Sequence, residues 1–99
     1  MAKATDAELQ RWRELEAEVV LNALAEFAKR DPTFRPIKDQ ATVRWHASAR
    51  HRDFELLLTG PRFFDSRAAK GGGGAIDLAM HLLQTTFVDA VKALRAAGI

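Results

Sequence analysis

Cysteine is absent from this sequence of 99 residues, and so is tyrosine. Without cysteine the chain has no disulfide, no thiolate nucleophile and no zinc site built on cysteine sulfur. No stretch approaches the roughly 20 apolar residues that a membrane-spanning helix needs. The first six residues, MAKATD, lack the apolar core of a signal peptide. We therefore expect a cytoplasmic protein that makes no contact with a membrane.

The rest of the composition is that of an ordinary globular protein, with 47% hydrophobic and 28% charged residues. A chain of this length fits one domain, which we expect to cover 1–99. Such a small domain buries roughly 65% of its unfolded surface and has little room for a deep catalytic cleft. Because no nucleophile–base motif or nucleotide-binding glycine motif is present either, we expect no enzymatic activity, no catalytic residues and no cofactor.

The net charge of +2 is unevenly distributed along the chain. Segment 1–34 carries five basic and seven acidic residues, whereas segment 35–74 carries eight basic and four acidic ones. Localised positive charge is typical of a protein that binds a polyanion. A solvated basic surface would have the same composition, so charge alone leaves both interpretations open.

Segment 1–34 is predicted to form a long helix followed by a loop. The residues at 5 and 8, Thr and Glu, have the spacing of a capping box, and apolar residues then recur at helical spacing. An Asp-Pro pair at 31–32 disfavours helix there, so we expect one amphipathic helix over 6–30. Its apolar stripe includes three interface candidates, Leu9, Trp12 and Val19; alternatively, Trp12 only covers the sheet.

Segment 42–65 predicts three antiparallel strands. Residues 42–47 and 53–59 alternate between apolar and polar, and 62–65 follows the turn signal Gly60-Pro61. All connections have hairpin length. The predicted fold class is therefore α+β: a long N-terminal helix, a three-stranded antiparallel meander, a glycine-rich turn and two C-terminal helices.

Four consecutive glycines, Gly71 to Gly74, lead into the C-terminal region. They predict either a flexible hinge or a backbone path that needs positive φ. Apolar spacing then predicts helices over 75–84 and 86–97, or one helix across both, with Gly98 as the C-cap. Asp77 is expected to cap the first helix or to fix the turn before it.

Three short stretches carry a resemblance to a known family: RFFD at 62–65, KGGGGAIDL at 70–78 and FVDAV at 87–91. In this order and spacing they resemble the CHC2 zinc-ribbon domain of DnaG-type primases. Related domains begin the primase-like, toprim-containing replication proteins of plasmids, phages and integrative elements. The resemblance covers 42–97, and it implies a module that binds single-stranded template DNA while a separate domain performs catalysis.

The sequence departs from this family at its metal site. The primase domain binds zinc through three cysteines and one histidine, whereas this chain has Phe-Phe-Asp-Ser-Arg at 63–67, where the second cysteine pair would fall. His46, His51 and His81 lie on separate predicted elements without ligand spacing. The resemblance therefore implies a zinc-free relative in which a hydrophobic core replaces the metal, and we expect no metal site.

Our first hypothesis is an accessory module of a mobile-element replication system that binds single-stranded DNA, with a replication or DNA-processing protein as a further partner. Proteins that bind single strands combine cations with exposed aromatic rings. Phe63 and Phe64 alternate, so one ring is expected on each face of the sheet, unless both are buried. The candidate binding residues are Arg44, His46, Arg50, His51, Arg52, Arg62, Phe63, Arg67 and Lys70, followed by the glycine turn Gly71, Gly72, Gly73, Gly74 and Asp77.

The alternative hypothesis is a protein-interaction subunit. In this case helix 6–30 pairs with a partner or with a second copy, and the primase-like half 42–97 serves only as a scaffold. The sequence leaves open whether the nucleic acid is DNA or RNA, and whether these residues are part of a longer protein.

Overall fold

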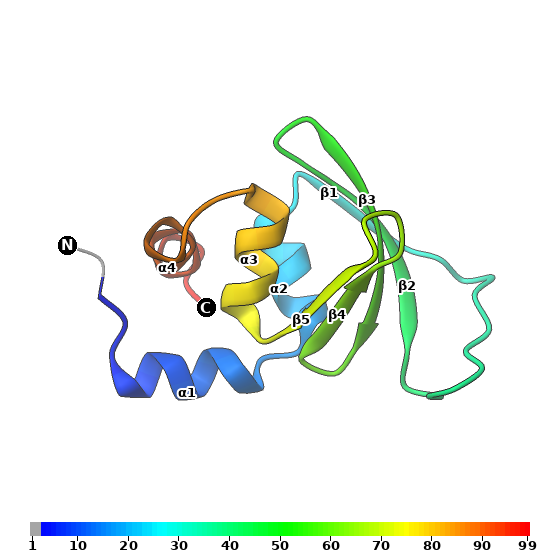
Figure 1. The fold of residues 1–99 in the computed structure, drawn as a ribbon, viewed down its shortest axis with the longest axis horizontal. Coiled ribbons are helices and arrows are strands. Elements are labelled where there is room, and N and C mark those ends of the chain that lie inside the picture. The colour runs from blue at the N-terminus through cyan, green and yellow to red at the C-terminus, as the bar shows by residue number, and fades with distance from the viewer. Residues whose placement is uncertain (1–2) are drawn as a thin grey trace.

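Residues 3–99, the part of the chain that the computed structural model describes, form four helices and five strands. In chain order these are α1 (Asp6–Glu14), α2 (Ala17–Leu24), β1 (Phe27–Arg30), β2 (Val43–Ala49), β3 (Arg52–Thr59), β4 (Arg62–Asp65), β5 (Lys70–Gly73), α3 (Ala75–Leu83) and α4 (Phe87–Ala96). The strands pair in chain order as one antiparallel sheet. The helices lie on one side of the sheet, with α2 and α3 close to it and α4 beyond α3 (Figure 1).

The face of the sheet toward the helices is apolar because side chains alternate along each strand. Ala47 lies opposite Phe54, and Leu58 lies opposite Phe63, so these four side chains share that face and are buried. They form one hydrophobic core with helical residues that include Trp12, Leu21, Leu78, Leu82 and Leu94. The fold is thus α+β, as expected, but it differs from the predicted architecture in two places.

The predicted long helix over 6–30 is wrong, because the chain turns between α1 and α2. Leu15 and Glu16 have extended ψ angles of 135° and 136°. The Ala17 amide, at the start of α2, donates to the carbonyl of Gly60 in the β3–β4 turn at 2.8 Å. A carbonyl distant in sequence therefore satisfies an amide that a continuous helix would have paired internally.

The turn also changes which apolar residues are buried. In a continuous helix Val19, seven residues after Trp12, would lie on the same face. Instead Val19 is 45% exposed, whereas Trp12 and Val20 are buried. The two helices thus present different faces to the core, and the stripe inferred from the sequence does not exist as one surface.

The predicted three-stranded meander with a glycine-rich turn is also wrong, because the sheet has five strands, with a further strand at each edge. β1 is formed by residues that were predicted to end the long helix. The Glu26 amide donates to the Ser48 carbonyl at 2.8 Å, and the residues after Glu26 then pair antiparallel with β2. β5 comes from the glycine run, which pairs with β4. Tertiary pairing therefore overrides the local helical pattern in one case and the flexibility of glycine in the other.

The two C-terminal helices are confirmed close to their predicted bounds. Thr86 caps α4, since its hydroxyl accepts from the Asp89 amide at 3.2 Å. Beyond the end of α4, Gly98 has a φ of 76° and donates to the Arg95 carbonyl, while Ile99 donates to the Leu94 carbonyl. This pair of hydrogen bonds is a Schellman motif, which needs the left-handed conformation that glycine adopts readily.

Candidate nucleic-acid interface

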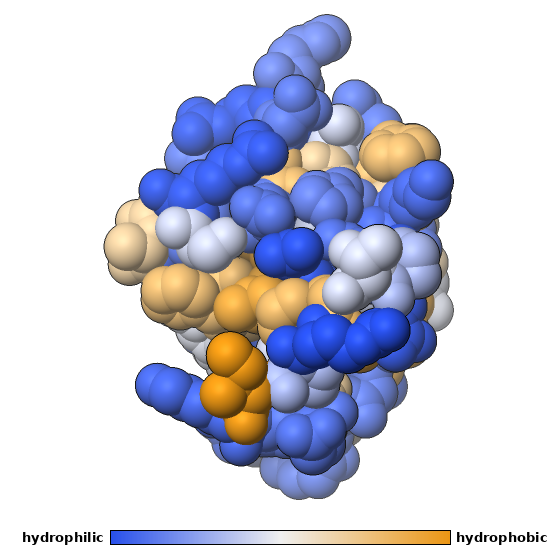
Figure 2. Space-filling view, turned by 90° about the vertical axis from the view of Figure 1, so that its right-hand side faces the viewer, coloured by the Kyte–Doolittle hydropathy of each residue, from blue (hydrophilic) through white to orange (hydrophobic). Residues whose placement is uncertain are grey.

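The second face of the sheet has no helix of residues 3–99 packed on it, and we call it the open face. The strand register places Lys29, Arg44, His46, Leu57 and Phe64 on this face. Figure 2 shows the open face with apolar side chains gathered near its centre and hydrophilic ones around them. It is therefore a mixed apolar and charged surface built on a five-stranded sheet.

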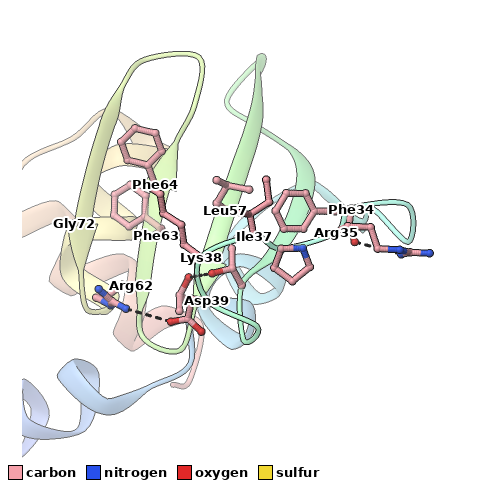
Figure 3. A pocket seen from close by; sticks show the side chains of 13 residues that line it. Phe34, Arg35, Ile37, Lys38, Asp39, Leu57, Arg62, Phe63, Phe64 and Gly72 are labelled. Atoms are coloured by element: carbon pink, nitrogen blue, oxygen red, sulfur yellow. Dashed lines mark hydrogen bonds and ion pairs between the residues drawn. The ribbon is translucent and has the colours of Figure 1, made fainter.

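A groove of about 690 Å³ lies on the open face between β4 and the loop that joins β1 to β2. Phe34 and Ile37 of the loop lie on one side, Phe64 lies on the other, and Leu57 lies between them (Figure 3). Ile37 is 92% exposed and Phe64 is 44% exposed. The volume is within the range of about 300–1,000 Å³ that small-molecule sites occupy.

The groove is bordered by more basic than acidic residues. Arg35 and Lys38 come from the loop and Arg62 from the start of β4, and Asp39 is the one acid among the lining residues. The Arg62 guanidinium lies 4.0 Å from the Asp39 carboxylate, and its side chain remains 69% exposed. The groove thus combines apolar walls with positive charge at the rim.

Asp31 anchors the first part of the loop to the sheet. One carboxylate oxygen accepts from the amide and the hydroxyl of Thr33, and the other accepts from Nε and Nη2 of Arg44 at 3.0 and 2.8 Å. The bonds from Thr33, followed by those from Arg44, hold the pKa of Asp31 well below its usual range. The Arg44 guanidinium in turn lies 5.1 Å from the centre of the Phe34 ring. Phe34 is therefore held in place by a charged network.

The glycine strand makes room for the phenylalanines of β4. A Cβ atom on Gly71 would lie 3.2 Å from Cδ1 of Phe64, and one on Gly72 would lie 2.9 Å from Cε1 of Phe63. Gly71 therefore allows the Phe64 ring to lie close on the open face, and Gly72 does the same for Phe63 on the core face. Asp77 accepts from the Gly73 amide at 3.2 Å, which is the turn-fixing role expected of it.

The structure places the basic residues predicted for binding in several separate areas. Arg44 and His46 lie on the open face, but both contact Asp31, at 2.8 and 3.4 Å. Arg62 alone among the predicted residues borders the groove as a cation. The others are exposed at turns: Arg50, His51 and Arg52 at the β2–β3 turn, and Arg67 and Lys70 at the β4–β5 turn. The structure thus does not bring the predicted set together as one compact site.

Phe63, the aromatic residue predicted for binding, belongs to the core. Its side chain is only 5% exposed and packs beside His81, with ring centres 5.3 Å apart. The alternation of β4 leaves Phe64 on the open face instead. Phe64 therefore replaces Phe63 as the aromatic candidate.

The interface candidates of the N-terminal segment do not form one exposed surface. Trp12 is buried, and its Nε1 donates to the carbonyl oxygen of Ile99 at 2.9 Å. Leu9 is half-buried and Val19 is exposed on a different helix. Trp12 is therefore a core residue and not part of an exposed interface, although its helix packs against α3 and not, as the alternative expected, on the sheet. The long pairing helix on which the interaction hypothesis depends is absent from residues 3–99.

Asp65 and His81 form a buried pair between β4 and α3, with Oδ2 and Nε2 2.6 Å apart. Burial would raise the pKa of Asp65, but the bonds from His81 and from the Ala68 and Arg67 amides lower it overall. The pair thus fastens the β4–β5 turn to the helical layer. Within residues 3–99 no three histidine, aspartate or glutamate side chains gather as a metal site would require.

Comparison with known proteins adds no relative: no family model, no curated protein and no solved structure matches this chain. Across residues 3–99, every helix is too short or too polar to cross a bilayer.

The sequence interpretation missed the loop residues Phe34, Arg35, Ile37 and Lys38, which line the groove. Two prolines and few apolar side chains made 31–41 resemble a plain linker. The available signal was an isolated Phe and an isolated Ile within a basic, polar loop. Their partners on β3 and β4 become visible only when the sheet is assembled.

Proposed function

We propose that this chain binds single-stranded nucleic acid, with DNA as the expected form, on the open face of its sheet. Phe64 carries the proposal, since it is an exposed aromatic ring on a five-stranded sheet beside a cationic rim. Proteins that bind single strands without strict sequence preference combine aromatic surfaces for base stacking with positive charge for the phosphates. The groove supplies both within one area.

The resemblance of 62–65, 70–78 and 87–91 to primase zinc-ribbon domains supports the same function. On this basis we propose that the chain acts in the cytoplasm as an accessory module of a mobile-element replication system. Its glycine strand and Asp77 then have a structural part in the site, because they position β4 and Phe64 rather than contact the ligand.

The test is fluorescence anisotropy with labelled single-stranded and double-stranded oligonucleotides of one sequence at several salt concentrations. We expect tighter binding to the single strand, and an affinity that falls with salt by a log–log slope of about −0.7 per neutralised phosphate. Arg62→Ala, which removes a cation from the rim of the groove, should weaken binding and reduce this slope.

Lys92→Ala is the matched control, because Lys92 is an exposed cation on α4, on the helical side of the molecule. It should leave the affinity unchanged. The proposal fails if no oligonucleotide binds at low salt, or if Lys92→Ala weakens binding as much as Arg62→Ala.

A further inference from the structure

The groove has features that a surface for phosphate contacts alone would not need. Ile37 is 92% exposed and lies opposite Phe64 across the groove. Apolar side chains that gather beside a groove commonly mark a binding site. A ligand that fills this space would cover Ile37, Phe34, Leu57 and Phe64 at once.

The two aromatic rings that border the groove, Phe34 and Phe64, are each held in place by neighbouring residues. The Asp31–Arg44 pair fixes the start of the loop, and the Arg44 guanidinium contacts the Phe34 ring. On the opposite side, Gly71 leaves the space in which the Phe64 ring lies. Preorganised walls lower the entropic cost of binding a flat ligand between them.

Two hydroxyl groups add a polar element to the apolar lining. Thr42, just before β2, and Thr59, at the end of β3, both line the groove, and their Oγ1 atoms lie 2.7 Å apart. A hydroxyl can both donate and accept, so this pair can bind the edge of a heterocycle. Arg35, Lys38 and Arg62 at the rim favour a ligand that also carries negative charge.

An apolar ring with polar edges and an attached phosphate is a nucleotide. We propose that the groove is a base pocket, which takes an unstacked base of the bound strand between Phe64 on one side and Phe34 and Ile37 on the other. The threonine hydroxyls bind the edge of this base, and the rim cations bind the flanking phosphates. This inference rests on the proposed function, but it makes the narrower claim that a base enters the groove and is enclosed on both sides, and does not only stack on Phe64.

The experiment compares a labelled oligothymidylate with an oligonucleotide of equal length and charge that carries abasic sites. The wild-type chain should bind the first about tenfold more tightly or better, because stacking one base contributes about 1–3 kcal/mol. Phe64→Ala and Ile37→Ala should reduce this ratio toward one and leave the abasic affinity unchanged. Since Ile37 is almost fully exposed, its replacement tests the pocket without threatening the fold.

Phe27→Ala is the matched control, because Phe27 lies on the same open face, is 55% exposed and does not line the groove. It should preserve the ratio, whereas Arg62→Ala should weaken both oligonucleotides in proportion. A ratio that falls in Phe64→Ala but not in Ile37→Ala refutes the base pocket and leaves the proposed function standing, because a base then stacks on Phe64 without entering the groove. Equal binding of the two oligonucleotides by the wild-type chain overturns both.

Absence of binding to both oligonucleotides would overturn the proposed function together with this inference. A labelled acidic peptide with two phenylalanines is the remaining comparison. If it binds in a manner that depends on Phe64 and Ile37 while oligothymidylate does not bind, the groove is a peptide site and the base pocket is wrong.

Discussion

At the scale of single residues, Arg50 and His51 at the tip of the β2–β3 hairpin stand out by their backbone angles. Both have positive φ, 51° and 65°, in a two-residue turn whose preferred sequence is Asn-Gly. Such conformations cost on the order of 1–3 kcal/mol per non-glycine residue. An exposed arginine and an exposed histidine therefore occupy positions that stability alone would give to other residues.

The first prediction is that the double substitution Arg50→Asn, His51→Gly stabilises the protein. Both new residues adopt positive φ more readily, so we expect a gain of about 1 kcal/mol, or a rise in Tm of roughly 4–8 °C for a domain of this size. Thermal unfolding followed by circular dichroism measures it. Arg67→Asn is the control, because it removes a cation from the neighbouring β4–β5 turn, and it should leave Tm nearly unchanged. If the double variant does not raise Tm, the explanation from backbone angles is wrong.

At the scale of elements, β5 shows how a glycine run becomes part of a sheet. Its residues have little preference for extended structure, and they form a strand because β4 pairs with them along its whole length. The space left beside Gly71 is filled by the Phe64 ring on the open face, and the space left beside Gly72 is filled by the Phe63 ring on the core face. The three strand glycines are therefore not equivalent.

The second prediction is that Gly71→Ala and Gly72→Ala destabilise the protein while Gly73→Ala does not. A Cβ on Gly71 would lie 2.9 Å from the Phe63 carbonyl oxygen, and one on Gly72 would lie 3.0 Å from Cβ of Asp77. Overpacking of this kind costs about 1–3 kcal/mol. The nearest atom to a Cβ on Gly73 is Cγ of Arg62, at 3.7 Å, which is an ordinary contact.

Urea unfolding of the three variants measures these differences, with Gly73→Ala as the matched control. The same loss of stability in all three would show that β5 needs glycine for its backbone rather than for the space beside Phe63 and Phe64. Gly71→Ala should also weaken oligonucleotide binding at concentrations where the variant is folded, because it displaces the Phe64 ring.

At the scale of the whole molecule, a salt bridge joins the first helix, α1, to the last helix, α4. Glu8 on α1 accepts from Nε and Nη2 of Arg95 on α4 at 2.8 and 2.7 Å. These bonds, together with that from the Thr5 amide, lower the pKa of Glu8 from 4.5 to about 2. The pair therefore holds α1 against α4, although the two residues are 87 positions apart in the sequence.

The third prediction concerns the pH dependence of stability. Because the folded-state pKa of Glu8 is depressed, its contribution is complete above about pH 4.5 and is lost as the pH falls toward 2. Glu8→Gln should be less stable than wild type at neutral pH. This difference in stability should shrink as the pH falls from about 4.5 toward 2. Urea midpoints measured between neutral pH and about pH 2 give the comparison.

Glu14→Gln is the control for this experiment, since the Glu14 carboxylate contacts Gln10 within α1 and no residue of α4. The urea midpoint of Glu14→Gln, plotted against pH, should run parallel to that of the wild type. Asp65 and Asp31, whose pKa values are also lowered, remain in all three proteins, so their loss in acid cancels in the difference. A gap between wild type and Glu8→Gln that persists to about pH 2 would show that Glu8 acts by packing rather than by charge.

Elements whose signals are local could be predicted from the amino-acid sequence. The strands predicted over 42–47, 53–59 and 62–65 from alternation and hairpin turns overlap β2, β3 and β4. The two C-terminal helices follow from apolar spacing, the Thr86 cap and Gly98. The alternation in β4 also indicated that Phe63 and Phe64 lie on opposite faces. These features depend on interactions between residues close in the chain, which a pattern can record.

Features that depend on partners distant in the chain could not be predicted and appear only in the folded molecule. The helix predicted over 6–30 turns at Leu15 and Glu16 because the Gly60 carbonyl is there to accept from Ala17, and its end becomes β1 because β2 offers a free edge. The groove likewise exists because Asp31 and Arg44, 13 positions apart, hold the loop beside Phe64. Partners separated in sequence meet only after the chain has packed, so no local pattern could place them together.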